Sequence, residues 1–155
     1  MKEGIYANIV DMNMIVSQRI LILGGASSFF IGGLHIIAIL IGAPAYDFLD
    51  APELSILAQQ GSYLPTLITL GVSFFFFIFA AYAFSGVGWI RTLPLLKKML
   101  TLIACLYIVR GMAVIWYVFL VFVDSPMAVP REIVFSFFSL AVGYCYFLGV
   151  RSLPF

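Results

Sequence analysis

Apolar residues form four long runs along the chain, and short polar stretches separate the runs. The runs cover about residues 20–43, 64–84, 99–123 and 133–150. A helix that crosses the bilayer core needs about 20 consecutive apolar residues, and each run is near that length. The pattern therefore predicts an all-α integral membrane protein, a four-helix transmembrane bundle that occupies residues 1–155 as a single transmembrane domain.

The composition agrees with this class. The 155 residues are 64% hydrophobic and only 10% charged, whereas soluble domains carry about 25% charged residues. The net charge is +1, and no basic patch or stripe is present, so nothing in the sequence indicates nucleic-acid binding. We therefore expect membrane lipids as the surroundings and no separate soluble domain.

The charges of the polar stretches predict the orientation. The stretch between the second and third runs holds three bases and no acid, whereas the stretch between the first two runs holds three acids and no base. These residues are Arg91, Lys97 and Lys98 in the basic stretch, and Asp47, Asp50 and Glu53 in the acidic one. Because short basic loops stay in the cytoplasm, we expect both termini to be cytoplasmic.

Shorter helices are expected outside the spans. Residues 1–19 carry Ile5 and Ile9 at helical spacing and predict an amphipathic segment, which either lies in the membrane interface or extends the first span. In the first outer loop, Asp50 resembles a helix N-cap. Together with Gly61 as a stop signal, it predicts a short interfacial helix over about residues 51–60.

A single charge lies deep inside the third run. Arg110 is the only charged residue between Met99 and Val123, and at ~1.5 Å per residue it lies roughly 17 Å from one end and 20 Å from the other. A guanidinium at this depth costs roughly 2.5–3.5 kcal/mol on insertion scales, so it should face protein or trapped water. We expect no carboxylate at its own depth. The candidate partners are hydroxyls and carbonyls of neighbouring helices, Glu132, Asp11, and an anion that is not protein.

Small and polar residues recur at helical spacing in every run, as in membrane helices that pack closely. These stripes are interpreted either as packing seams alone or as seams that turn Arg110 and His35 toward one interior site. For His35, the alternative to a ligand-binding role is a ring bonded to a hydroxyl or a carbonyl. The stripes are Gly24, Ser28, Gly32 and His35; Ser62, Thr66, Thr69, Ser73 and Ala80; Tyr107, Arg110, Ala113, Tyr117 and Asp124; and Glu132, Ser136, Ser139, Gly143 and Tyr146.

The sequence lacks the motifs of several membrane enzymes and transporters. Cys105 and Cys145 do not form a CxxC pair, no His-Glu-x-x-His is present, and the first run has no proton-coupling glutamate. His35 is the only histidine, and it cannot build a zinc or haem site without further ligands. The sequence therefore predicts no catalytic residue, no metal site and no cofactor.

Four short segments resemble small bacterial inner-membrane proteins. They are Gly42-Ala43-Pro44-Ala45-Tyr46, Tyr82-Ala83-Phe84-Ser85-Gly86-Val87-Gly88, Arg91-Thr92-Leu93-Pro94-Leu95-Leu96 and Arg110-Gly111. The group that the chain resembles consists of four-span proteins without an assigned activity. The resemblance covers most of the chain, and it implies a bacterial inner (cytoplasmic) membrane and no particular chemistry.

The leading hypothesis is a non-enzymatic protein that binds or helps to move a small amphiphile or lipid with an anionic or carbonyl head. Its pocket would lie inside the bundle and open outward. The alternative is a structural or accessory subunit of a larger membrane complex, in which Arg110 pairs with a carboxylate of a partner subunit. A homo-oligomer is also open, and it would count against this alternative. The predicted ligand-binding residues are Arg110, His35, Gln59, Gln60, Tyr63, Thr66, Tyr117 and Glu132.

Overall fold

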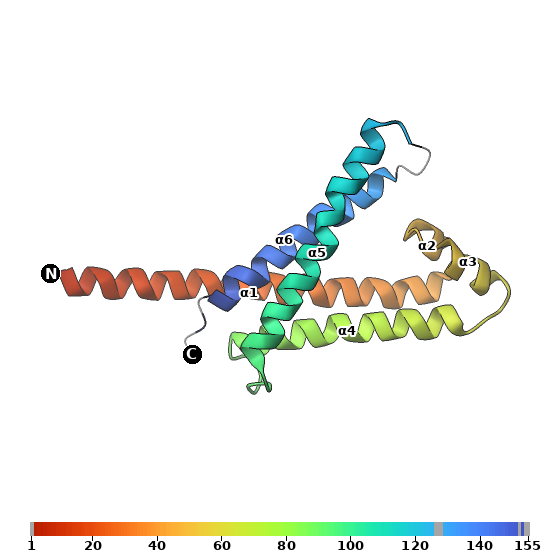
Figure 1. Ribbon diagram of the computed structural model, residues 1–155. Coiled ribbons are helices and arrows are strands. Elements are labelled where there is room, and N and C mark those ends of the chain that lie inside the picture. Colours follow the sequence, from red (N-terminus) through yellow and green to blue (C-terminus); the bar gives the residue numbers. More distant parts are fainter. Residues whose placement is uncertain (1, 126–128, 152, 154–155) are drawn as a thin grey trace. The chain divides into compact units, whose positions relative to one another are not determined.

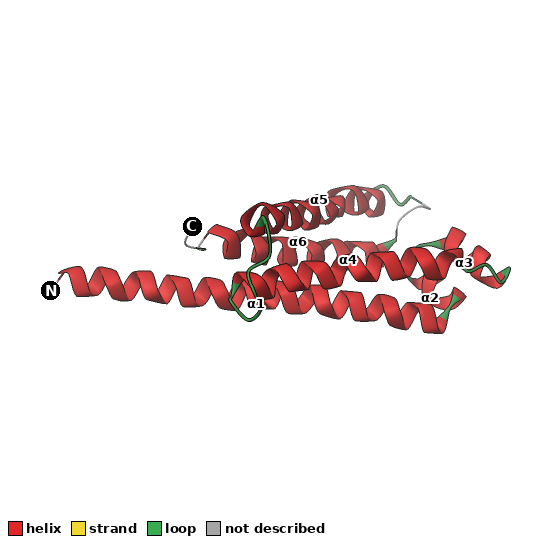
Figure 2. Ribbon diagram, turned by 90° about the horizontal axis from the view of Figure 1, so that it is seen from below, coloured by secondary structure: helices red, strands yellow, loops and turns green. Residues whose placement is uncertain are grey.

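The structure is a computed structural model that describes residues 2–125, 129–151 and 153. The described chain is all-α, which confirms the expected fold class, with four long apolar helices and short helices between α1 and α4 (Figures 1 and 2). The helices are α1 (Lys2–Ile41), α2 (Ala43–Phe48), α3 (Pro52–Gln59), α4 (Leu64–Gly86), α5 (Leu96–Phe122) and α6 (Pro130–Arg151).

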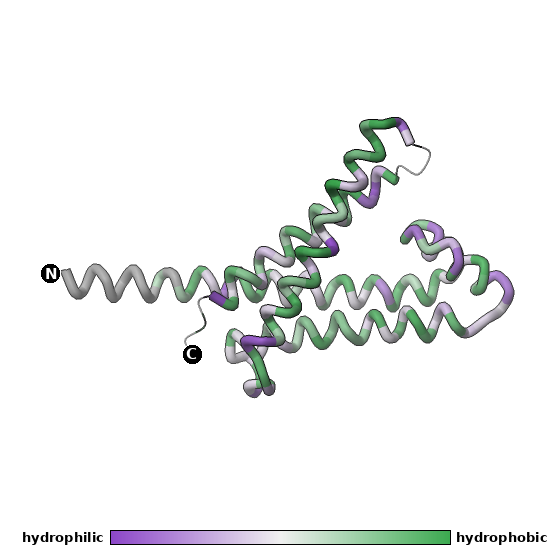
Figure 3. The backbone as a smooth tube through the Cα atoms, in the orientation of Figure 1, coloured by the Kyte–Doolittle hydropathy of each residue, from purple (hydrophilic) through white to green (hydrophobic). Residues whose placement is uncertain are grey.

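The four long helices provide segments that are long and apolar enough to cross a membrane. Figure 3 shows the hydrophobic colour recurring along each of them, while the hydrophilic colour gathers mainly at turns. Large apolar side chains such as Phe74, Val109 and Phe122 remain exposed, as expected for helices that face lipid rather than water. The segments are Met14–Ile41, Leu64–Gly86, Leu96–Phe122 and Pro130–Arg151.

Two of these helices begin earlier than the apolar runs predict. α1 is unbroken from Lys2, so the helix of the first span includes residues 2–19. The face predicted at Ile5 and Ile9 lies outside the residues whose side chains are described. α6 begins at Pro130, because proline suits the first turn of a helix. As a result, Glu132 becomes part of the first turn of α6.

The chain divides into two compact units, which are described separately. The hairpin unit comprises residues 26–80, with the second part of α1, the short helices α2 and α3, and most of α4. The α5–α6 unit comprises residues 1–25 and 81–155.

In the hairpin unit, small and polar residues bring α1 and α4 together. The buried Ser73 Oγ donates a hydrogen bond of 2.8 Å to the carbonyl oxygen of Gly32. A Cβ atom at Gly32 would lie 3.2 Å from the carbonyl oxygen of Ser73, so glycine permits this close approach. The buried Thr69 hydroxyl donates to the Tyr46 hydroxyl of α2 over 3.5 Å. These contacts support the interpretation of the stripes as packing seams.

The segment between α1 and α4 differs from its expected geometry at Asp50. This residue ends α2 in the left-handed conformation, with φ 57°, and its N–H donates to the Asp47 carbonyl while that of Ala51 donates to the Tyr46 carbonyl. This pair of bonds is the Schellman motif of a helix C-terminus. The N-cap of α3 is Ala51, so the prediction of Asp50 as the N-cap is wrong by one residue, although α3 lies close to the expected helix.

In the α5–α6 unit, two glycines set the contact between α5 and α6. A Cβ atom at Gly111 would lie 2.7 Å from the backbone nitrogen of Leu140, and one at Gly143 would lie 3.0 Å from the backbone nitrogen of Ile108. The distance at Gly111 is too short for a side chain and that at Gly143 is tighter than an ordinary contact, so the two backbones approach closely at these positions. α5 and α6 therefore lie side by side (Figures 1 and 2).

This contact rotates α5 away from its expected orientation. Of the stripe predicted for the third run, only Tyr107 is buried, while Arg110 and Asp124 are exposed. Tyr107 stacks on Tyr146 of α6, with ring centroids 5.8 Å apart. The predicted stripe is right in part, because Tyr107 and Arg110 contact α6, but the closest approach of the two backbones is at Gly111. The buried residues of α5 are Leu96, Leu100, Ile103, Ala104, Tyr107, Gly111, Val114 and Leu120.

Candidate functional site

Arg110 of α5 is bound by two side chains of α6. Its Nη2 donates a hydrogen bond of 2.6 Å to Glu132 Oε2, which forms an ion pair, and its Nη1 donates one of 3.1 Å to Ser136 Oγ. Glu132 and Ser136 are four residues apart on one helix and therefore share a face. Of the expected partners of Arg110, the structure therefore places Glu132 and a hydroxyl, that of Ser136, beside the guanidinium.

The two members of the ion pair differ in exposure. The Glu132 side chain is 6% exposed and that of Arg110 is 46% exposed. A buried carboxylate requires a charged or hydrogen-bonding partner, and Arg110 supplies it. A guanidinium carries more N–H donors than the two used in these bonds. The guanidinium therefore stabilises Glu132, while the Arg110 side chain as a whole remains half-exposed.

Two further residues of this unit, Tyr117 and Ser136, concern the surroundings of Arg110. The predicted site residue Tyr117 lies two turns after Arg110 on α5 and is partly exposed. Ser136 was not among the predicted site residues, although it is fully buried and bonds Arg110. Its position four residues after Glu132 is the sequence signal that could have identified it.

His35 lies on α1 in the hairpin unit and is partly buried. Its Nδ1 donates a hydrogen bond of 2.8 Å to the carbonyl oxygen of Ile31, and its ring lies 5.2 Å from that of Phe76. The structure therefore agrees with the interpretation of His35 as a ring bonded to a carbonyl. The bond leaves Nε2 as the ring nitrogen that faces away from the backbone.

Three other predicted residues gather at the turn between α3 and α4. Gln59 donates through Nε2 to Ser55 Oγ over 3.2 Å, Gln60 is the exposed C-cap of α3, and Tyr63 is 83% exposed. Thr66 follows in the first turn of α4 and is partly buried. Gln59, Gln60 and Tyr63 are thus exposed within one short stretch of the chain.

The predicted residues thus fall into separate units. The structure brings Arg110 together with Glu132, and it gathers Gln59, Gln60 and Tyr63 at one turn. A single pocket that holds both Arg110 and His35 stays a prediction. Among the residues that the structure describes, no group of three or more histidine, cysteine, aspartate or glutamate side chains could hold a metal ion.

Comparison with known proteins identifies no family: no protein-family model, no curated protein and no solved structure matches the chain significantly. Four spans agree with the four-span group that the sequence resembles. The four long helices have the length and the apolarity of membrane spans, and their large apolar side chains are exposed. The chain is an integral, multi-pass membrane protein with four spans.

Proposed function

We propose that this protein binds, and helps to move, a small amphiphile or lipid whose head group accepts hydrogen bonds from Arg110. The observation that carries the proposal is the half-exposed guanidinium in the middle of an apolar span. Ionisable residues inside a membrane are expensive and commonly mark the path of a substrate or ion. Arg110 is held in position by Glu132 and Ser136, so its remaining donors are preorganised for a ligand.

The ion pair also indicates which head group fits best. Glu132 already balances the charge of Arg110 at 2.6 Å, and its carboxylate repels a second anion that approaches closely. A neutral acceptor, such as an ester carbonyl, gains hydrogen bonds to the guanidinium without that repulsion. Within the class of anionic and carbonyl heads, the geometry therefore favours the carbonyl.

Ligand binding can be measured with three probes that differ only in their head group. Decane, decanoate and methyl decanoate are added to the detergent-solubilised protein, and the shift in thermal unfolding temperature is recorded. We expect methyl decanoate to give the largest shift, decanoate a smaller one and decane almost none. Arg110→Met combined with Glu132→Leu removes both charges, a change that membrane packing should tolerate. This double variant should lose the shift.

The matched control is Lys97→Met, which removes an exposed base at the start of α5 and should leave the shift unchanged. Equal shifts for the wild type and the double variant would refute the binding proposal. The alternative, an accessory subunit, uses the same exposed donors for a partner's carboxylate. It would be favoured if the protein purified in native-lipid nanodiscs carried a stoichiometric partner, whereas a monomer or homo-oligomer counts against it.

We further propose that the protein lies in a bacterial inner membrane with both termini in the cytoplasm. The support is the contrast between the basic α4–α5 turn and the acidic segment between α1 and α4. In a variant without Cys105 and Cys145, a cysteine at Gln60 should react with an impermeant maleimide in intact cells. A cysteine at Gly88 should react only after the membrane is opened. The reverse pattern would invert the orientation.

A further inference from the structure

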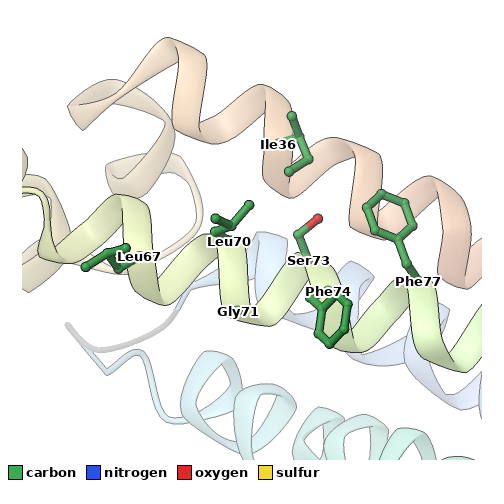
Figure 4. Close-up of a pocket in the computed structure, with 7 residues that line it drawn as sticks. All are labelled: Ile36, Leu67, Leu70, Gly71, Ser73, Phe74 and Phe77. Atoms are coloured by element: carbon green, nitrogen blue, oxygen red, sulfur yellow. The ribbon is translucent and has the colours of Figure 1, made fainter.

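The two units offer a ligand different surfaces. In the hairpin unit, the open pocket beside α4 is lined mainly by leucine, isoleucine and phenylalanine, and Ser73 supplies its only polar side chain. Figure 4 shows Ser73 directed toward α1, where its hydroxyl donates to the Gly32 carbonyl. The lining carries no charge, so it does not distinguish one head group from another. The ion pair of the α5–α6 unit does.

The charges at Arg110 are balanced before a ligand arrives. Glu132 Oε2 accepts a hydrogen bond of 2.6 Å from Arg110 Nη2, so the guanidinium and the carboxylate together carry no net charge. The Glu132 side chain is 6% exposed, and water therefore contributes little to the stabilisation of its charge. The negative charge of Glu132 depends on the guanidinium beside it.

The other charged groups near this pair in the chain cancel one another. On α6, Arg131 directly precedes Glu132, and Asp124 follows the end of α5, so these two residues add one charge of each sign. The rest of both apolar runs is uncharged. Tyr117, a phenol, lies two turns after Arg110 on the same face of α5 and adds no charge. A bound ion would therefore change the net charge of the whole region.

An anionic head group at Arg110 would upset this balance. Two negative charges would then share one guanidinium in an apolar span, where an uncompensated charge is strongly unfavourable. Arginine keeps its proton in proteins, so Arg110 cannot restore the balance. A carboxylate can, because two like charges at one site favour the neutral form of one of them. Glu132 is a buried carboxylate, and it becomes neutral when it binds a proton.

We propose that the site takes up one proton with each anionic head group that it binds, and that Glu132 holds this proton. The inference rests on the proposed function, since it requires a ligand at Arg110. The proton comes from water and forms an O–H bond with the Glu132 carboxylate, while the head group replaces that carboxylate as the partner of the guanidinium. When the head group leaves, Glu132 releases the proton and the ion pair forms again.

This exchange explains how one site can accept both classes of head group. A carbonyl binds beside the intact ion pair and needs no proton, whereas an anion binds after Glu132 has become neutral. Ser136 Oγ accepts a hydrogen bond of 3.1 Å from Arg110 Nη1, and this uncharged partner can hold the guanidinium in place in both forms. An anion and a proton together add no net charge, which suits movement through an apolar region.

The test counts protons by isothermal titration calorimetry in a nonionic detergent. Decanesulfonate is the anionic probe, because it keeps its charge over the whole pH range, and methyl decanoate is the neutral probe. Each titration is repeated in phosphate and in Tris, whose different ionisation enthalpies reveal the protons exchanged with the buffer. We expect the protein to take up about one proton per decanesulfonate and none per methyl decanoate.

The affinities should depend on pH in the same way. As the pH rises, the uptake of one proton weakens the binding of decanesulfonate by about tenfold per pH unit wherever Glu132 is charged in the free protein. The affinity for methyl decanoate should change little. In Glu132→Gln, which has no carboxylate to protonate, decanesulfonate should bind without proton uptake and equally well at every pH. If this variant is too unstable to purify, the proton count of the wild type still decides the question.

Glu53→Gln is the matched control, because it removes an exposed carboxylate of α3, and it should leave the proton count unchanged. The double variant Arg110→Met with Glu132→Leu measures how much of each probe enters the micelles. Binding of decanesulfonate to the wild type without proton uptake would overturn this inference and leave the proposed function standing. If neither probe bound the wild type more than the double variant, the proposed function and this inference would both be overturned.

Discussion

Replacing Glu132 with glutamine is expected to lower the free energy of unfolding by about 3 kcal/mol, because it leaves Arg110 charged without its carboxylate. The 2.6 Å ion pair would be lost, while the shape of the side chain changes little and one oxygen remains to accept a hydrogen bond. Arginine cannot lose its proton in a protein. The charge therefore remains deep in an apolar span, where stabilisation by water is weak.

Replacing the other member of the ion pair, as in Arg110→Met, should lower the free energy of unfolding by less. Glu132 is almost fully buried, and a buried carboxyl group can become neutral by taking up a proton instead of remaining charged. The double variant Arg110→Met with Glu132→Leu should be close to the wild type in stability, since apolar replacement of a buried pair is often neutral or stabilising. With the single variant Glu132→Leu added, Arg110→Met and the double variant form a double-mutant cycle that measures the coupling of the pair.

Reversible unfolding in mixed micelles would provide the free energies. Glu53→Gln serves as the control, because Glu53 is an exposed carboxylate in the first turn of α3 and its loss should cost less than about 1 kcal/mol. If Glu132→Gln had the same free energy of unfolding as the wild type, the ion pair would not stabilise the protein. Other groups would then supply the hydrogen bonds that Arg110 requires.

The sequence predicts the spans well, because crossing a bilayer depends on the apolarity of each segment by itself. The rotation of each helix about its axis is harder to predict. α5 is apolar on every side, so hydrophobicity does not indicate which side meets α6. α5 meets α6 at Gly111 and Gly143, where the two backbones approach closely. Arg110 therefore lies beside the centre of this contact and not in it.

The partner of Arg110 illustrates the same limit. Glu132 was considered, but a helix begun at about residue 133 leaves it in the loop, outside the depth of the arginine. Pro130 starts α6 earlier, and that start places Glu132 and Ser136 on the face toward Arg110. Asp50 was misplaced for a related reason, because an aspartate can end one helix in the left-handed conformation as well as begin the next.

Gly111→Val is the second change for which we expect a large effect, a loss of about 3 kcal/mol from overpacking at a backbone contact. A Cβ at Gly111 would lie 2.5 Å from Leu140 Cγ and 2.7 Å from the Leu140 backbone nitrogen. A flexible side chain could move aside, but the backbone of α6 cannot shift without separating the helices. Even Gly111→Ala should be destabilising, although alanine favours helices over glycine.

Gly71→Ala supplies the control for this prediction, because it makes the same substitution in a transmembrane helix at a position with open space. It should be neutral or stabilising by up to about 1 kcal/mol.

Separating α5 from α6 would also stretch the bonds from Arg110 to Glu132 and Ser136. The effects of Gly111→Ala and Glu132→Gln should therefore be less than additive, because each variant already weakens the contact that the other disrupts. Full additivity would mean that the ion pair forms independently of the glycine contact, and an unaltered stability of Gly111→Ala would show that the two helices do not touch there.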